Sequence, residues 1–360
     1  MNYEFRRKKI IRKLKRKGID SFLTTHQVNL RYLCPSFTGE GVLRVARDMA
    51  FLLVDSRYTE QAKLQLEGEK GIEIAEMKKP FLASLIKIFA KVGIKSVAVE
   101  ADHITYGFFE KLRKKCKGIK IHPIRNWVGS LRIIKDEGEI VNIRRACNIV
   151  DRVAEAILKD IRWGMKEIEL ANELEYRLKK EGSGELPFSP IVAGGVRASF
   201  PHAQPTDEPI KEGEFVIIDC GASYNGYCSD LTRTIGKNIM DGEKKRIYNL
   251  VLEVQQAAIG NIKPEIKTSD ICKLVRERFF EEGVVQFFIH GLGHGVGLEV
   301  HEVPSLSSHS SVKLKEGMVI TIEPGLYIPN EYGVRIEDVV LITHNGCEVL
   351  TSSYKEHYEN

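Results

Sequence analysis

The chain has 360 residues, of which 43% are hydrophobic, and a formal net charge of +5. This length exceeds one typical hydrophobic core, so we expect two domains. No apolar run approaches the length of a membrane-spanning helix, which excludes a helical membrane protein. The seven cysteines show no CxxC spacing and no signal peptide precedes them, so a reducing cytoplasm is the expected compartment.

Residues 1–125 alternate helical and strand patterns, which predicts an α/β domain. The predicted helices begin at Tyr3 and Tyr58 and cover 81–91 and 106–115, and the predicted strands cover 21–24, 50–54 and 96–99.

The first predicted helix is crowded with Lys and Arg between residues 6 and 17, beside an amphipathic stripe. Such a run can contact nucleic acid. No aromatic stacking pattern or nucleic-acid motif accompanies it, so we interpret it as a solvated helix face and expect no nucleic-acid partner.

The pattern breaks at 126–130, and we expect a second domain over residues 131–360. Its predicted helices cover 137–161, 166–180, 242–260 and 269–282. Antiparallel strands are predicted between and after these helices, so the whole chain is assigned to the α+β class.

An Asn-Gly pair at 225–226 lies between two β-prone runs and predicts a hairpin with a two-residue turn. This register places Asp219 opposite Thr232 and Asp230 opposite Gly221. Both aspartates then share a face, roughly 7–8 Å apart at the backbone. Their carboxylates can converge on two cations about 3.5–4 Å apart. Taken alone, the pair is equally well explained as two unrelated surface acids.

Three histidines, His290, His294 and His301, lie in or next to a glycine-rich segment. Glycine at every second position from 291 to 297 excludes a stable helix, so these histidines do not form a helical ligand pair. The glycines instead favour a close approach of the backbone to a site.

Two further carboxylates lie on apolar strand patterns. Glu323 ends a predicted strand over 318–322, and Glu337 shares one face of a predicted strand over 333–340 with Arg335. Burying such a carboxylate costs several kcal/mol unless it is paired or bound to metal. Taken singly, each is more often a salt-bridge partner than a ligand.

These segments together resemble a known family. The motifs occur in order at 201–203, 218–222, 227–234, 290–302, 322–325 and 334–338, and resemble the pita-bread metallopeptidases, closest to the Xaa-Pro group of prolidases and aminopeptidase P. Segments 29–33 and 55–58 resemble the family's N-terminal creatinase-like domain, and 131–135 the start of its catalytic pita-bread domain. The resemblance covers essentially the whole chain.

The resemblance implies a two-metal site whose ligands are Asp219, Asp230, His294, Glu323 and Glu337. Four carboxylates and a neutral imidazole carry a charge of −4, which two divalent cations balance. Oxygen donors with one imidazole suit Mn²⁺ or Co²⁺, with Zn²⁺ and Fe²⁺ as alternatives.

The resemblance also implies roles for residues around the metals. Glu323 is expected to move a proton and His301 to stabilise the oxyanion. His202 and His290 are expected to face the substrate as further catalytic or binding residues, and Arg335 to orient a ligand carboxylate.

The implied reaction is hydrolysis of the bond between an N-terminal residue and proline, in dipeptides or short peptides. A homodimer in which the N-terminal domain narrows the entrance is also implied. Two alternatives stay open: a non-catalytic binding protein with the same fold, and a related aminopeptidase without proline preference. Some prolidases carry an arginine near Ser305, so its absence here weighs slightly against a strict dipeptidase.

Overall fold

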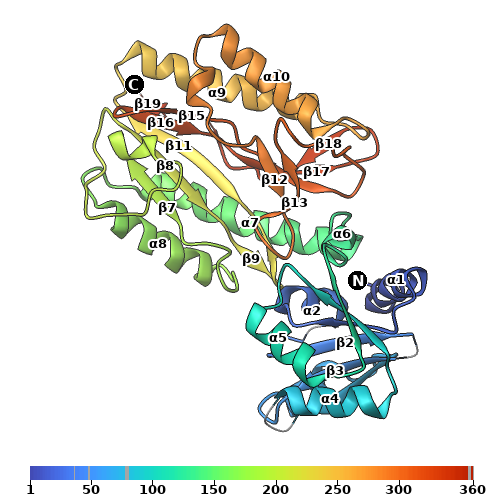
Figure 1. The fold of residues 1–360 in the computed structure, drawn as a ribbon. Helices are drawn as coiled ribbons and strands as arrows, with labels where there is room; N and C mark the ends of the chain where they lie inside the picture. The colour runs from blue at the N-terminus through green and yellow to red at the C-terminus, as the bar shows by residue number, and fades with distance from the viewer. Residues whose placement is uncertain (36, 48, 78–80, 356–357, 360) are drawn as a thin grey trace. The chain divides into compact units, whose positions relative to one another are not determined.

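The computed structural model describes residues 1–35, 37–47, 49–77, 81–355 and 358–359. Two compact units divide the chain, Met1–Arg132 and Ile133–Asn360 (Figure 1). The division falls just after the break in sequence pattern at 126–130.

The first unit contains a mixed six-stranded sheet in the order β4-β3-β2-β1-β5-β6. Its strands are β1 (Ser21–Thr24), β2 (Val42–Ala46), β3 (Ala50–Val54), β4 (Ile72–Glu76), β5 (Ser96–Glu100) and β6 (Lys120–Ile124). Its helices are α1 (Tyr3–Lys17), α2 (Gln27–Leu33), α3 (Thr59–Gln65), α4 (Phe81–Lys91), α5 (Tyr106–Lys115) and α6 (Gly129–Arg132). Apolar residues of α4 and α5, such as Phe89 and Leu112, pack in one core with Val97 and Val99 of β5. The expected α/β domain is therefore confirmed.

The second unit contains four long helices, each within one residue of its predicted bounds. They are α7 (Glu137–Asp160), α8 (Glu167–Lys180), α9 (Gly242–Gly260) and α10 (Thr268–Glu281). Helix α7 starts where Asp136 and Glu139 form a capping box, in which each side chain accepts a hydrogen bond from the other's backbone N–H. Two short 3₁₀ helices, η1 (Gly195–Ser199) and η2 (Val285–Phe287), complete the described helices.

Two sheets and two short hairpins make up the described strands of the second unit. One sheet has the order β19-β11-β8-β7, and the other β13-β12-β14-β17-β18. The first comprises β7 (Ile191–Gly194), β8 (Phe215–Cys220), β11 (Leu231–Lys237) and β19 (Tyr358–Glu359). The second comprises β12 (Gly293–Gly295), β13 (Glu302–Leu306), β14 (Val319–Ile322), β17 (Asp338–Ile342) and β18 (Cys347–Val349). The hairpins are β9 (Ser223–Tyr224) with β10 (Tyr227–Cys228), and β15 (Gly325–Ile328) with β16 (Tyr332–Arg335).

The helices of the second unit lie on two sides of its strands (Figure 1). Residues of α7 and α8 share one core with β7, β8 and β11. Residues of α9 and α10 share another with β14, β16 and β17. The strands beside the predicted ligands therefore lie between two helix-backed cores, and the predicted α+β class is confirmed.

The predicted hairpin has the expected register. Tyr227 pairs with Tyr224 in the short hairpin, and Thr232 pairs with Asp219 in the longer ladder. Asn225 has a φ of 50° and Gly226 a φ of 79°, as the turn requires. Asp230 falls in the gap between these two ladders, one residue before β11.

No helix in the described part of the chain is long and apolar enough to cross a membrane. The seven cysteines are free thiols.

Candidate metal centre

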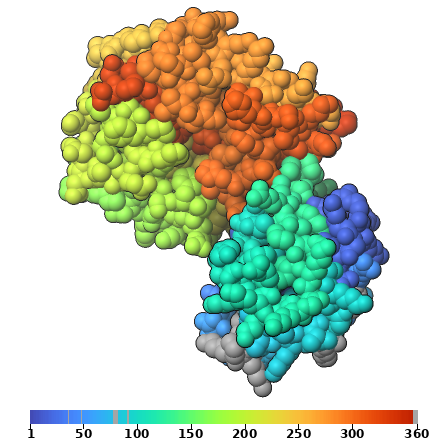
Figure 2. Space-filling view, in the orientation of Figure 1, coloured from blue at the N-terminus to red at the C-terminus, as the bar shows by residue number. Residues whose placement is uncertain are grey.

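All nine predicted site residues line one cavity of about 540 Å³ in the second unit. They are Asp219, Asp230, His294, Glu323, Glu337, His202, His290, His301 and Arg335. The cavity takes its walls from segments near 188–204, 290–305 and 323–337. In Figure 2 the surface of this unit is hollowed where its yellow-green and orange segments meet. Phe188, Ile191 and Val300 add apolar wall beside the polar groups.

Asp219 and Asp230 come from β8 and from the residue before β11. Both are buried. Oδ2 of Asp219 accepts a hydrogen bond from Nη2 of Arg335 at 2.7 Å, whereas Oδ1 is buried without a hydrogen-bond partner. Oδ2 of Asp230 lies 3.6 Å from Nε2 of His294. The hairpin thus brings one of its acids next to the predicted histidine ligand.

His294 lies in β12, where glycines let the backbone approach its neighbour. A Cβ atom on Gly293 would lie 2.1 Å from the carbonyl oxygen of Thr321, so only glycine fits there. Nδ1 of His294 is 3.1 Å from the carbonyl of Gly295, a contact that assigns the proton to Nδ1. Nε2 then presents its lone pair to the cavity, 3.3 Å from Oε1 of Glu323. Burial lowers the pKa of His294 to about 4, so the ring is neutral at pH 7.

Glu323 and Glu337 follow β14 and β16. Thr321 donates to Oε1 of Glu323 at 3.3 Å, and Thr232 donates to Oε2 of Glu337 at 2.7 Å. Oε1 of Glu337 is buried without a hydrogen-bond partner. Ligand atoms of Asp230, His294 and Glu337 all lie within 4.8 Å of one another, as a shared metal ion requires.

The four carboxylates are held close together at high electrostatic cost. Burial and mutual repulsion raise the pKa of Asp230 and Glu337 well above their usual range. Burial raises the pKa of Glu323 to about 7 and also raises that of Asp219, where Arg335 partly offsets it. A cation among these groups would remove the repulsion, because it pairs with the charged form of each.

Arg335 uses its guanidinium to hold the cavity wall together. Besides Asp219, it donates to the hydroxyl of Thr232 at 3.1 Å, the hydroxyl of Tyr327 at 2.7 Å and the carbonyl of Pro201 at 3.2 Å. We expected Arg335 to orient a ligand carboxylate. Its ion pair is with Asp219, and its link to Glu337, with which it shares a predicted strand face, runs through the Thr232 hydroxyl.

The other three histidines differ in how firmly they are held. His290 contacts the carbonyl of Gly291 through Nδ1 at 2.7 Å and the hydroxyl of Tyr327 through Nε2 at 2.9 Å. Its ring is therefore fixed. His301 packs edge-on against His294 with ring centroids 4.3 Å apart, and burial lowers its pKa. His202 is exposed at the cavity mouth.

Several supporting residues were not predicted from the sequence. The buried Tyr327 links Arg335 to His290, and burial raises its pKa to about 12. Lys135 forms a buried ion pair with Glu302, the neighbour of His301, at 3.4 Å. No motif marks the contacts of Tyr327 with His290 or of Lys135 with Glu302, because each joins separate segments of the chain.

The donor set fits a divalent metal pair. Two buried carboxylate oxygens, on Asp219 and Glu337, lack a hydrogen-bond partner, which is costly unless a ligand satisfies them. Oxygen donors with one neutral imidazole suit first-row divalent ions.

Comparisons with known proteins agree with this chemistry. A model of metallopeptidase family M24 matches residues 141–344, and a model of the creatinase/prolidase N-terminal domain matches residues 6–134. The chain belongs to metallopeptidase family M24, with a creatinase-like N-terminal domain and a pita-bread catalytic domain. Membership of this family implies a dinuclear metal site and peptide substrates.

Named relatives cover nearly the whole chain. A Xaa-Pro dipeptidase of Pyrococcus horikoshii is 39% identical over 97% of this chain and 97% of that protein. The structure of a Xaa-Pro dipeptidase from Bacillus anthracis is 37% identical, covers 99% of each chain and superposes with a TM-score of 0.95. The structure of an X-Pro aminopeptidase from Thermotoga maritima is 34% identical, covers 98% of this chain and 99% of that chain, and gives a TM-score of 0.89.

Proposed function

We propose that this protein is a dinuclear metal-dependent exopeptidase that hydrolyses the bond between an N-terminal residue and proline. The observation that carries the proposal is the convergence of four carboxylates and one neutral imidazole on a single cavity with an apolar wall. The names of the relatives support proline as the second residue of the substrate.

We propose Asp219, Asp230, His294, Glu323 and Glu337 as the residues that hold two divalent ions, with Mn²⁺ or Co²⁺ as the first choice and Zn²⁺ or Fe²⁺ as alternatives. Bound ions would polarise the scissile carbonyl and acidify a water molecule.

The chain's own residues complete the proposed mechanism. Glu323, with its raised pKa, takes a proton from the attacking water and delivers it to the leaving amine. His301, at the exposed side of His294, donates to the developing oxyanion. Arg335 keeps Asp219 in position, and Tyr327 fixes the ring of His290 in the wall.

The charges in the cavity favour peptides longer than dipeptides. Among the described lining residues, Arg335 is the one permanently charged cation, and it is committed to Asp219, Thr232, Tyr327 and a backbone carbonyl. A dipeptide places its carboxylate next to the reacting bond, where no described lining residue offers a permanently charged cation free to pair with it. We therefore propose tripeptides and longer short peptides with proline second as the preferred substrates.

The test compares cleavage of Ala-Pro, Ala-Pro-Ala and Ala-Ala-Ala by metal-depleted protein, with and without Mn²⁺ or Co²⁺. We expect cleavage only with metal, fastest for Ala-Pro-Ala and slowest for Ala-Ala-Ala. Equal cleavage of Ala-Ala-Ala would refute the proline preference, and faster cleavage of Ala-Pro would refute the length preference. Full activity without metal would refute the two-metal mechanism.

The family resemblance also leads us to propose a homodimer and, together with the free thiols, a reducing cytoplasm. Light scattering tests the assembly: a monomer at all concentrations with unchanged activity would remove the dimer.

A further inference from the structure

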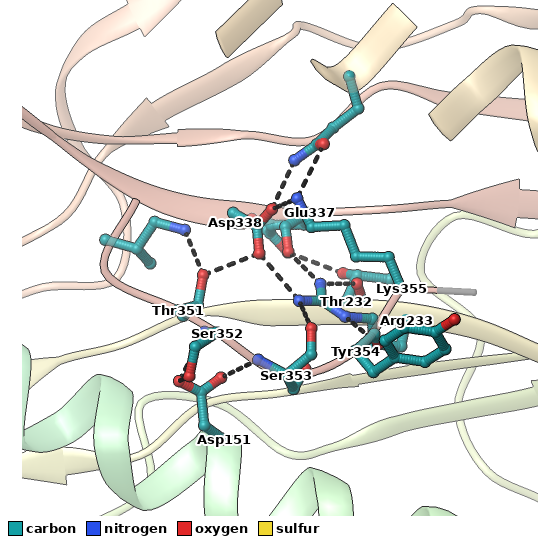
Figure 3. Close-up of polar contacts among 12 residues, drawn as sticks. Asp151, Thr232, Arg233, Glu337, Asp338, Thr351, Ser352, Ser353, Tyr354 and Lys355 are labelled. Carbon is teal, nitrogen blue, oxygen red and sulfur yellow. Dashed lines mark hydrogen bonds and ion pairs between the residues drawn. The ribbon is translucent and has the colours of Figure 1, made fainter. Parts of the chain in front are cut away.

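A second buried polar cluster lies next to the predicted ligand Glu337 (Figure 3), and its residues Arg233 and Asp338 are not part of the cavity lining. Its centre is the ion pair between Arg233 of β11 and Asp338 of β17, at 2.9 Å, with both side chains almost completely buried. Asp338 directly follows Glu337, which lines the cavity, and Arg233 directly follows Thr232, whose hydroxyl donates to the Glu337 carboxylate. Successive residues of a strand point to opposite faces, so the cluster backs the site.

Every N–H of the Arg233 guanidinium is used. It donates to the carbonyls of Thr232 and Glu337 at 2.9 and 2.6 Å, to Asp338, and to the carbonyls of Ser353 and Tyr354 at 2.8 and 3.1 Å. One side chain thus joins β11 and β17, the strands that directly follow Asp230 and Glu337, to the segment 351–355, which follows the last strand of the second sheet.

Both carboxylate oxygens of Asp338 likewise have two polar partners each. One oxygen accepts from Arg233 and from the hydroxyl of Thr351 at 2.9 Å, and the other accepts from Gln255 at 2.7 Å and from the ammonium of Lys355. The segment is also fixed to α7, because Asp151 accepts from the backbone N–H groups of Ser352 and Ser353 at 2.7 and 3.0 Å.

The cluster is coupled to Glu337 by short contacts. The backbone N–H of Glu337 donates to the Thr232 carbonyl at 3.1 Å, and the Thr232 hydroxyl donates to the Glu337 carboxylate at 2.7 Å. Arg233 binds the backbone carbonyl of each of these residues. A shift of Arg233 would therefore move both ends of the contact that aims the Glu337 carboxylate into the cavity.

We propose that Arg233 and Asp338 are positioning residues of the metal centre, and that the segment 351–355 clamps them so that Glu337 is held ready for metal. This inference rests on the proposed metal site. Groups that orient a ligand from behind typically change metal affinity by about 10- to 100-fold when removed. The clamp thus sets metal affinity from outside the cavity.

The test weakens the clamp at two partners of Asp338 outside the cavity and measures metal binding directly. Thr351→Val and Lys355→Met each remove one partner of Asp338 without touching the cavity. Calorimetric titration of metal-depleted protein with Mn²⁺ and with Co²⁺ is expected to show several-fold weaker binding for each variant and about 10-fold or more for the double variant. Lys355→Arg, which keeps the charge, is expected to restore binding.

Lys237→Met is the matched control, because Lys237 lies on the same strand as Arg233 but pairs with Glu212 at 2.7 Å, outside the cluster. Its metal affinity should equal that of the wild type. Thermal unfolding of the metal-free proteins is measured in parallel.

Unchanged metal affinity in the double variant, with or without a lower unfolding temperature, would reduce the clamp to a purely structural feature and overturn the proposal. An equal loss in Lys237→Met would also overturn it. Wild-type protein that binds neither ion would refute the metal site itself, whereas metal binding without proline preference would refute only the substrate assignment.

Discussion

At the scale of single residues, the site contains side chains that hydrogen bonds hold in place and a side chain that is exposed to the cavity. Arg335, Tyr327 and His290 are joined by hydrogen bonds and form a rigid wall. His301 has a ring contact with His294 but stays exposed toward the cavity. The exposed imidazole of His301 is therefore a group that we expect to meet substrate.

His301→Ala should lower kcat by about 10²- to 10³-fold with little change in KM, because a donor to the oxyanion acts only in the transition state. Steady-state kinetics on a proline-containing tripeptide would measure both constants, and metal analysis would confirm that the variant keeps its ions. His344→Ala, at an exposed position, is the control. A variant that kept kcat and lost only affinity, or lost its metal, would contradict the role given to His301.

Glu337→Gln should lose bound metal and lower kcat/KM by at least about 100-fold, since it removes a charged donor from the site. The metal-free variant should nevertheless unfold at a higher temperature than the metal-free wild type at pH 7. Burial raises the pKa of Glu337 well above its usual range, so the folded state is penalised at any pH above the ordinary value of 4.5.

Metal analysis and thermal scans with and without added ions measure both effects. The exposed Glu331→Gln serves as control. A metal-free variant less stable than the metal-free wild type would show that the Glu337 carboxylate is not held at a cost.

Some of the site residues could be predicted from the sequence and others could not. The ligand-type residues stand in local patterns, such as the Asn-Gly turn that fixes Asp219 against Thr232. Tyr327 was missed because its position depends on two tertiary contacts. It pairs with Gly333 across the β15–β16 hairpin. Gly333 in turn lies so close to Ala198 that a Cβ atom on it would be 2.0 Å from the Ala198 carbonyl oxygen. Such contacts are not encoded in any short spacing.

At the scale of elements, the sequence patterns predicted where strands lie more reliably than which strands pair with each other. We predicted one strand over 333–340. The structure contains two strands, β16 and β17, which pair with β15 and β14 respectively. Ile336 and Glu337 lie between them, so the predicted ligand lies at a change of partner. An apolar run shows that a segment is buried but not which neighbours it has.

The short strands of the first unit were predicted incompletely for a related reason. β4 and β6 are edge strands with only partly buried side chains, so their alternation is weak. β2 was also missed: it is fully buried yet includes Arg44, whose guanidinium lies 5.5 Å from the ring of Phe51. A charged residue in the middle of a strand interrupts the apolar pattern that indicates a buried strand, unless the partner of its charge is known.

Gly293→Ala tests the close approach of β12 to β14. Its Cβ would lie 2.1 Å from the Thr321 carbonyl oxygen, so β12 must move and carry His294 with it. We expect destabilisation of about 1–3 kcal/mol together with weaker metal binding. Gly242→Ala, at the open start of α9, should change stability by less than about 1 kcal/mol. Denaturant unfolding and metal titration would measure both, and wild-type metal affinity in Gly293→Ala would contradict this account of the glycine.

At the scale of the whole molecule, each of the two units contains buried acids whose ionisation opposes folding. The predicted metal site belongs to the second unit, whereas a different buried acid, Glu100, belongs to the first. The two-domain α+β fold could be predicted because long helices and family motifs span the chain. Glu100 could not be singled out, since nothing around it in the sequence indicates burial of its charge.

Glu100→Gln should make the first unit more stable above neutral pH. Burial raises the pKa of Glu100 from 4.5 to about 7, although Thr24 and Asn29 donate to its carboxylate. The folded state therefore holds a proton that the unfolded chain has released between these values, and stability falls as the pH rises through that window. Above pH 7 the cost amounts to about 3 kcal/mol.

An uncharged glutamine avoids this cost, and the Thr24 hydroxyl can rotate to accept from its amide. Denaturant unfolding at pH 5 and pH 8 would measure the difference, followed by tryptophan fluorescence in a Trp163→Phe background so that the signal comes from Trp127 of the first unit. We expect the variant to gain stability at pH 8 and to show a flatter pH dependence, whereas the exposed Glu60→Gln should change stability by less than about 1 kcal/mol at both values. A wild-type protein equally stable at both pH values would mean that Glu100 ionises without cost, and that Arg132, whose charge lowers its pKa, compensates fully for burial.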